Sequence, residues 1–207
     1  GLDAGVSVAA FEDKKVYVVW TAHGKTNAEK DRLLFVAYSK NAGKSFSKES
    51  PINGDRPGIC ACCGIDAGLT VDGEIMILYR SAGTGARDMT LLQGKPGKTL
   101  TYTMLDQWNA NACPMSSMSV VGGKEPLMTW QTKEQVFYTS VDEKGVLKDK
   151  TTFPGFGKTR KHSTLARNND GNMCLAWTEG VGWNKGGKVL WQVQDANGVM
   201  ISDGQEN

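Results

Sequence analysis

Cysteine is the residue type whose spacing most clearly suggests chemistry in this sequence. Three of the five cysteines stand together in the segment Cys60-Ala61-Cys62-Cys63, and Cys113 lies farther along the chain. A disulfide from the first group to Cys113 would tie two separate segments together, and it is the commoner explanation for such a set. Cys174 lies in an apolar run and is expected to be a small buried side chain. The odd number leaves at least one thiol outside any internal disulfide.

The same cysteines also suit a thiolate metal site. Cys60, Cys62, Cys63 and Cys113 would supply sulfur ligands, with a nearby methionine or histidine as a further ligand. Sulfur ligands favour soft ions such as Cu(I) or Zn(II). The spacing is not that of a zinc ribbon, and no cofactor is required by the pattern. Both interpretations therefore stay open at this point.

Polar and aromatic side chains gather in the connections between apolar segments. Loops are ordinarily polar, but that alone does not explain loops rich in Arg, Trp and Cys. Convergence of such groups from several connections is typical of a ligand site. The candidate ligand-binding residues are Arg56, Arg87, Asp88, Asn111, Arg160, His162 and Trp183.

The elements that must position these loops are short strands. Period-two alternation of apolar residues predicts four groups of four strands, each with tight turns that draw on the 25 glycines. A glycine turn follows the third strand of every group, at a period of roughly 50 residues. These turn glycines are Gly43, Gly97, Gly145 and Gly198.

The repeat predicts an all-β fold, a β-propeller with four recognisable four-stranded blades. Residues 1–207 are expected to form a single propeller domain or fragment, with blades at approximately 6–52, 65–105, 116–153 and 162–202. In a propeller, the connections between blades and those between second and third strands lie on one face, and the glycine turns lie on the other. The cysteine and arginine candidates are therefore expected to share a face.

The turn Ser39-Lys40-Asn41-Ala42-Gly43-Lys44-Ser45-Phe46 resembles the Asp-box, Ser-x-Asp-x-Gly-x-Thr-Trp, of sialidase-like BNR-repeat propellers. The Ser and Asn side chains are expected to bond the turn backbone, Gly43 to supply a positive φ, and Phe46 to plug the hairpin into the blade. The Cys-x-Cys-Cys segment is similar to that of a bacterial, mostly uncharacterised group of these proteins. Sialidase rings have six blades, so the resemblance implies either a smaller complete ring or part of a six-bladed one.

The resemblance also implies a candidate enzymatic site. A retaining sialidase uses an arginine cluster for the substrate carboxylate, a tyrosine nucleophile beside a glutamate, and an aspartate acid–base. The Phe-Arg-Ile-Pro segment of true sialidases is absent, and every tyrosine falls in a predicted strand. The candidate catalytic residues are Arg80, Arg87, Asp88, Arg160 and Glu179.

Three functions remain. The first is an exported, non-catalytic propeller that binds a glycan or a soft metal on its Cys- and Arg-bearing face. The second is an exo-glycosidase of the sialidase type that acts on acidic sugars. The third is a periplasmic copper- or zinc-binding protein.

Composition and charge narrow the choice of partner. With 24 basic and 22 acidic residues, the net charge of +2 gives no electrostatic reason to expect nucleic acid. No segment reaches the roughly 18 unbroken apolar residues of a membrane helix, so membrane insertion is not expected. Cysteine content and resemblance point to a periplasmic or extracellular location, although no leader is visible. The expected partners are a glycan or other small molecule, with self-association or further blades completing the ring.

Overall fold

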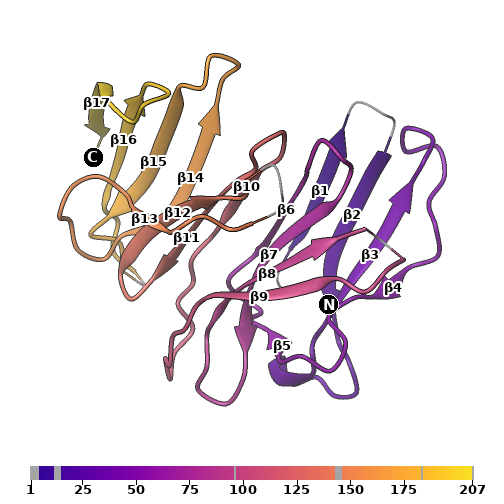
Figure 1. The fold of residues 1–207 in the computed structure, drawn as a ribbon. Coiled ribbons are helices and arrows are strands. Elements are labelled where there is room, and N and C mark those ends of the chain that lie inside the picture. The colour runs from indigo at the N-terminus through magenta and orange to yellow at the C-terminus, as the bar shows by residue number, and fades with distance from the viewer. Residues whose placement is uncertain (1–4, 12–14, 96, 143–145, 183, 207) are drawn as a thin grey trace.

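The computed structural model describes residues 5–11, 15–95, 97–142, 146–182 and 184–206. Four antiparallel sheets follow one another along an open arc, with the N-terminal and C-terminal sheets at opposite ends (Figure 1). We call these sheets blades 1 to 4 in chain order. They confirm the predicted all-β propeller architecture.

Each blade is a meander whose strands lie side by side in chain order. Blade 1 contains β1 (Val6–Phe11), β2 (Lys15–Ala22), β3 (Leu33–Ser39) and β4 (Ser50–Pro51). Blade 2 contains β6 (Ile65–Leu69), β7 (Ile75–Ala82), β8 (Met89–Gly94) and β9 (Thr101–Asp106), and β5 (Gly58–Ile59) pairs with the end of β7. Blade 3 contains β10 (Ser119–Val121), β11 (Leu127–Thr132), β12 (Gln135–Ser140) and β13 (Thr151–Thr152). Blade 4 contains β14 (Lys161–Arg167), β15 (Met173–Glu179), β16 (Lys188–Gln194) and β17 (Met200–Glu206).

The hydrophobic cores lie between neighbouring blades. Val19 of blade 1 belongs to the same buried cluster as Ile77 of blade 2, and Leu78 of blade 2 to the same cluster as Met128 of blade 3. A third cluster joins blades 3 and 4. All eight side chains of β7 are buried, because blade 2 has a blade against each of its faces. Burial between sheets therefore stabilises the arc, as in other layered β folds.

The inner strands are also joined by polar contacts. The Asp66 carboxylate of β6 accepts a hydrogen bond from the Ser7 hydroxyl of β1 at 2.8 Å and another from the backbone N–H of Val120 in β10 at 2.8 Å. One side chain thus connects three consecutive blades near the inner edges of their sheets. A hydrogen-bonded carboxylate can sit in this position without the cost of an unpaired buried charge.

The turn after β3 has the hydrogen bonds expected of it, with one difference. The Ser39 hydroxyl accepts the backbone N–H of Gly43 at 2.9 Å, and the Asn41 side chain accepts that of Ser45 at 3.0 Å. Gly43 has a φ of 81°, a conformation that glycine adopts without strain. Phe46, however, is 45% exposed and does not plug the hairpin into the blade. It precedes the hydrogen bond from Ser47 N–H to the Tyr38 carbonyl, by which the chain rejoins the sheet.

Both ends of the arc leave apolar sheet surface exposed. In β1, Val6 and Val8 are 57% and 60% exposed, and in blade 4 Val189 is 48% exposed. These side chains lie on the sides of blades 1 and 4 that do not face a neighbouring blade. The described residues include no helix long and apolar enough to span a bilayer.

Candidate functional site

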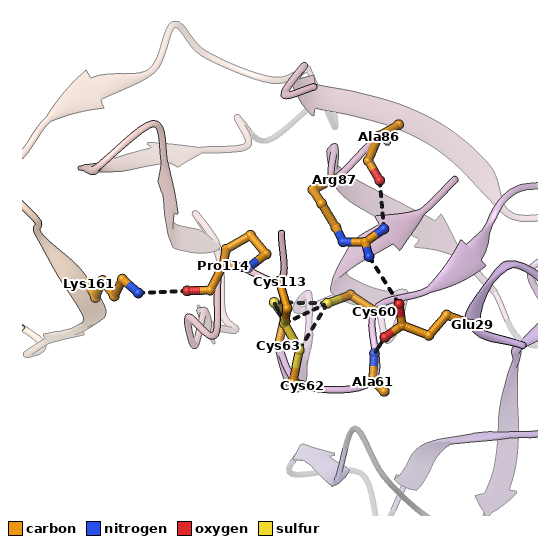
Figure 2. Close-up of a disulfide and its surroundings, with 10 residues drawn as sticks. All are labelled: Glu29, Cys60, Ala61, Cys62, Cys63, Ala86, Arg87, Cys113, Pro114 and Lys161. Carbon is orange, nitrogen blue, oxygen red and sulfur yellow. Dashed lines mark hydrogen bonds and ion pairs between the residues drawn. A yellow bond between two sulfur atoms is a disulfide. The ribbon is translucent and has the colours of Figure 1, made fainter. Parts of the chain in front are cut away.

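Four cysteines converge at the seam between blades 2 and 3 (Figure 2). Cys60, Cys62 and Cys63 lie in the segment between β5 and β6, and Cys113 lies in the connection from β9 to β10. The Cys60 sulfur is 3.1 Å from that of Cys63, and 3.6 Å from those of both Cys62 and Cys113. A disulfide joins Cys62 to Cys113, so the predicted bond between the first cysteine group and Cys113 is confirmed.

Burial and hydrogen bonding distinguish these sulfurs. Cys60 and Cys63 are buried as free thiols, whereas Cys62 is exposed and Cys113 is half-buried. The hydrogen bond from Cys60, with the backbone N–H groups of Met115 and Ser116, lowers the pKa of Cys63 to about 6 despite burial. The same hydrogen bond and burial raise the pKa of Cys60. The Cys60–Cys63 hydrogen bond therefore shifts the pKa values of the two thiols in opposite directions.

Arg80 of β7 lies beside the sulfurs and is fully buried. Its Nη1 donates to the Arg87 carbonyl at 2.7 Å, and its Nη2 donates to the Gln131 carbonyl of blade 3. The guanidinium also stacks on the Trp108 ring, with its carbon 5.3 Å from the ring centroid. Burial lowers the pKa of Arg80, and attraction to the Cys63 and Cys60 sulfurs opposes that shift. Arg80 is thus part of the inter-blade seam and unable to reach a ligand at the surface.

Arg87 belongs to a clamp over the cysteine segment (Figure 2). Its Nη2 forms an ion pair with Glu29 at 3.1 Å, and the other carboxylate oxygen of Glu29 accepts the backbone N–H of Ala61 at 2.7 Å. Glu29 starts a short 3-10 helix, η1 (Glu29–Asp31), between β2 and β3. The amino-acid sequence does not indicate a role for Glu29, because Glu29 is one of several charged residues in a polar loop.

Arg160 occupies a second seam, between blades 3 and 4. It is fully buried, and its Nε forms an ion pair with Glu179 at 3.1 Å. Its Nη1 donates to the Phe153 carbonyl at 3.0 Å, and its Nη2 donates to the Pro154 carbonyl. Glu179 also accepts the indole N–H of Trp177 at 3.0 Å. The structure therefore brings the predicted site residues Arg160 and Glu179 together, and their contacts hold blades 3 and 4 against each other.

The other predicted site residues make separate contacts. The Asp88 carboxylate accepts the backbone N–H of Trp108 at 2.9 Å, which ties the β7–β8 connection to the following loop. Arg56 packs on the Tyr102 ring and donates to the Leu100 carbonyl at the outer edge of blade 2. The roles of these side chains in binding stay predictions.

Three further candidates complete the set. Asn111 is exposed, with its amide oxygen 3.2 Å from the position that a Cβ on Gly85 would take. The Nδ1 of His162 is 3.3 Å from the Ser117 hydroxyl, and partial desolvation and Lys161 lower the pKa of His162. Trp183 lies outside the described residues.

Cys174 differs from its prediction as a buried side chain. It is an exposed free thiol in β15. Neighbours Leu175 and Trp177 on the same strand point toward blade 3 and are buried, so Cys174 points to the opposite, uncovered side of blade 4. The apolar run indicated a strand correctly, but it did not indicate which face would be covered.

A groove of about 260 Å³ lies beside the Arg160–Glu179 pair. The polar side chains along it include Glu179, Gln192 and Asp203, and the aromatic ones include Trp177 and the fully exposed Phe156. Two larger grooves, of about 700 and 450 Å³, flank Arg56. Unlike these two grooves, the groove at the seam of blades 3 and 4 combines aromatic surface with carboxylates.

The sequence matches no protein-family model and no curated protein sequence. Solved structures of sugar-active proteins nevertheless share its fold. A member of the GH130 family of mannoside phosphorylases, described as containing glycoside hydrolases that target β-1,2 mannosidic linkages in Candida mannan, is 17% identical with a TM-score of 0.53. The match covers 96% of this chain and 68% of that chain.

Two further solved structures of sugar-active proteins also share this fold. The α-L-arabinofuranosidase Arb93A from Fusarium graminearum, in complex with an iminosugar inhibitor, is 9% identical with a TM-score of 0.61, over 97% of this chain and 65% of that one. The GH43_1 enzyme from Xanthomonas citri, complexed with xylotriose, is 9% identical with a TM-score of 0.55, over 97% and 73%. These identities establish the fold and not the activity. The chain has the β-propeller fold of glycoside hydrolases and spans about two thirds of their length.

Proposed function

We propose that this protein is an exported, glycan-binding propeller that does not hydrolyse its ligand. The observation that carries the proposal is the groove of about 260 Å³ between blades 3 and 4. It has room for about one sugar ring and offers the two kinds of surface that sugar recognition needs. Aromatic rings cover the apolar C–H face of a sugar, and carboxylate and amide oxygens accept its hydroxyl groups.

The groove residues divide into a fixed wall and an open side. Glu179 and Trp177 are held by Arg160 and by each other, so their positions are set before a ligand arrives. Pre-organisation of this kind reduces the entropy lost on binding. Phe156 and Asp203 are exposed on the open side, where they remain available to a ligand.

The contacts of the candidate catalytic residues favour binding over hydrolysis. Arg80 and Arg160 have no exposed surface, so neither can grip a substrate carboxylate as the sialidase alternative requires. Arg87 is paired with Glu29. Tyr79 is fully buried in β7, where it cannot act as a nucleophile toward a ligand in a groove. The geometry therefore supports a binding protein built on a glycosidase-type scaffold.

The Cys62–Cys113 disulfide supports an exported location. Disulfides persist in oxidising compartments such as the periplasm and the extracellular space, and they are uncommon in the cytosol. A glycan ligand would be encountered in the same compartments. Similar solved structures whose descriptions mention mannan, an arabinofuranosidase and xylotriose set the choice of ligands to test.

The test is calorimetric titration with manno-, arabino-, xylo- and sialo-oligosaccharides. We expect one of these classes to bind, and Phe156→Ala to weaken that binding about tenfold, equivalent to about 1.4 kcal/mol. Phe46→Ala is the matched control, because Phe46 is also an exposed phenylalanine but lies in the turn after β3. Binding that is unchanged in Phe156→Ala, or release of fluorophore from 4-methylumbelliferyl glycosides that Glu179→Gln abolishes, would contradict the proposal.

A further inference from the structure

The four-cysteine cluster is separate from the proposed glycan groove, since it lies at the seam of blades 2 and 3. One disulfide does not account for its composition. The Cys62–Cys113 bond links the two segments, yet the buried thiols of Cys60 and Cys63 also point into the same small volume (Figure 2). All four sulfurs lie within 4.8 Å of one another.

The separations between these sulfurs match a metal site. A tetrahedral ion with metal–sulfur bonds of about 2.3 Å has sulfurs about 3.8 Å apart. The Cys60 sulfur lies 3.1 Å from Cys63 and 3.6 Å from Cys62 and Cys113, and Cys63 lies 4.0 Å from Cys113. Small sulfur movements, within the freedom of cysteine side chains, would place four ligands around one centre.

The groups around the four-cysteine cluster favour negative charge on its sulfurs. Arg80 is fully buried, and its Nε has no hydrogen-bond partner among the described residues. An unpaired buried cation is costly. The Cys63 and Cys60 sulfurs lie close enough to attract Arg80, as does the Asp106 carboxylate. Four thiolates around a divalent ion carry two negative charges, which a guanidinium at this position would stabilise.

Backbone N–H groups also favour negative charge on these sulfurs. The N–H groups of Met115 and Ser116 point to the Cys63 sulfur, and the N–H of Cys62 points to the Cys60 sulfur. Hydrogen bonds from surrounding groups orient and stabilise metal ligands. The clamp formed by Arg87 and Glu29 fixes the Ala61 backbone and so holds the cysteine segment in place. Cys62 is exposed, which provides a route of entry from solvent.

We infer that, when the Cys62–Cys113 disulfide is reduced, Cys60, Cys62, Cys63 and Cys113 bind one thiophilic d¹⁰ ion, Zn(II) in the first instance. A dithiol reductant transfers two electrons and two protons to the disulfide, giving two cysteine thiols and the cyclic disulfide of the reductant. Binding of Zn(II) then releases the protons of the coordinating thiols. The oxidised protein holds a cross-link between blades 2 and 3, and the reduced protein holds a metal at the same position.

The experiment counts accessible thiols and bound metal in the full chain. The protein is reduced with a dithiol under anaerobic conditions, freed of reductant and titrated with Zn(II). We expect one equivalent of zinc by elemental analysis. Cys60 and Cys63 are buried in any case, so we expect zinc to remove the reactivity of the two thiols freed by reduction, Cys62 and Cys113, and to leave Cys174 reactive. With Cd(II) in place of Zn(II), a sulfur-to-metal charge-transfer absorption should rise to a plateau at one equivalent.

Cys62→Ser tests the site with little risk to folding, because Cys62 is exposed. We expect it to weaken zinc binding at least tenfold while its circular dichroism stays that of the wild type. Cys174→Ser is the matched control and should bind zinc as the wild type does. Arg80→Met should weaken zinc binding through lost charge compensation, and its circular dichroism shows whether it folds.

Competition with Cu(I) identifies the preferred ion. Displacement of zinc by one Cu(I), with the same two thiols protected, would support the site and assign it to copper. A reduced, natively folded protein in which neither ion protects Cys62 and Cys113 would overturn the inference, as would zinc binding that Cys62→Ser leaves unchanged.

Discussion

Arg160→Met is expected to be one of the most damaging single substitutions in the chain. Arg160 has no exposed surface and holds five partners across the seam of blades 3 and 4. Besides the Glu179 ion pair, it donates to the Phe153 and Pro154 carbonyls and to Gln135, and it lies over the Trp177 ring, 4.9 Å from the centroid. Methionine has a similar length but restores none of these polar contacts.

The expected loss of stability follows from the buried groups that Arg160→Met leaves without a partner. Removing one partner of a buried ion pair costs about 3–5 kcal/mol, because the remaining charge and carbonyls lose their hydrogen bonds without gaining water. For a chain of this size, about 4 kcal/mol corresponds to a fall in Tm of about 10 °C. Glu179→Gln should cost less, about 1–2 kcal/mol, because Glu179 is 20% exposed and the new amide oxygen can still accept from Trp177.

The assay is urea denaturation followed by tryptophan fluorescence, with Arg167→Met as the control. Arg167 pairs with Glu125 near the surface, where the two side chains are 25% and 42% exposed. Such a pair contributes about 0–1 kcal/mol. If Arg160→Met cost no more than Arg167→Met, or if Glu179→Gln cost as much as Arg160→Met, the assigned role of Arg160 as the polar centre of this seam would be refuted.

Two further predictions concern single turns and close contacts. Asp195→Ala should destabilise the protein more at neutral pH than at pH 2. Backbone N–H bonds from Val199 and Asn197 lower the pKa of Asp195. The stabilisation by Asp195 is therefore present above the unfolded pKa of about 3.8 and is lost as the pH falls through the lower folded value. Thermal melts at both pH values would show it, and an equal loss at pH 2 would contradict it. Gly58→Ala should lower stability by about 1–3 kcal/mol, since a Cβ at this position would lie 1.9 Å from the Glu29 carbonyl oxygen of η1. Gly186→Ala is its control, with open space around the added methyl group, and equal unfolding midpoints for the two variants would show that η1 does not pack closely on β5.

Local sequence patterns predicted the strands well, because a strand and its turn depend on residues close together in the chain. The blade predicted at 6–52 contains β1 to β4, and the blade predicted at 116–153 contains β10 to β13. The short strand β5 was not expected, since Pro57 and Gly58 interrupt the pattern there. Outer strands were also imprecise: β17 runs to Glu206, beyond its predicted end at Ser202.

The site was predicted in part. The sequence suggested that the Cys60–Cys63 segment and Cys113 would meet, because they occupy consecutive connections between blades. It did not suggest that Glu29 would hold the cysteine segment, because Glu29 comes from the connection of a different blade and pairs with Arg87 across 58 positions of sequence. An arginine in such a sequence can bind a ligand or form a salt bridge between blades, and the pattern does not distinguish the two; Arg80 and Arg160 are buried in seams between blades.

The amino-acid sequence by itself determined the four-stranded sheets, the glycine turns and the set of chemically distinctive residues, since these depend on alternation and on local backbone preferences. The tertiary structure decided which of those residues reach solvent and which meet inside a seam. That outcome depends on how neighbouring blades pack, and hence on contacts between residues far apart in the chain. Arg80 shows the difference: the sequence identified it as a candidate site residue, but its burial beside the Cys63 and Cys60 sulfurs follows only from the packing of blade 2 on blade 3.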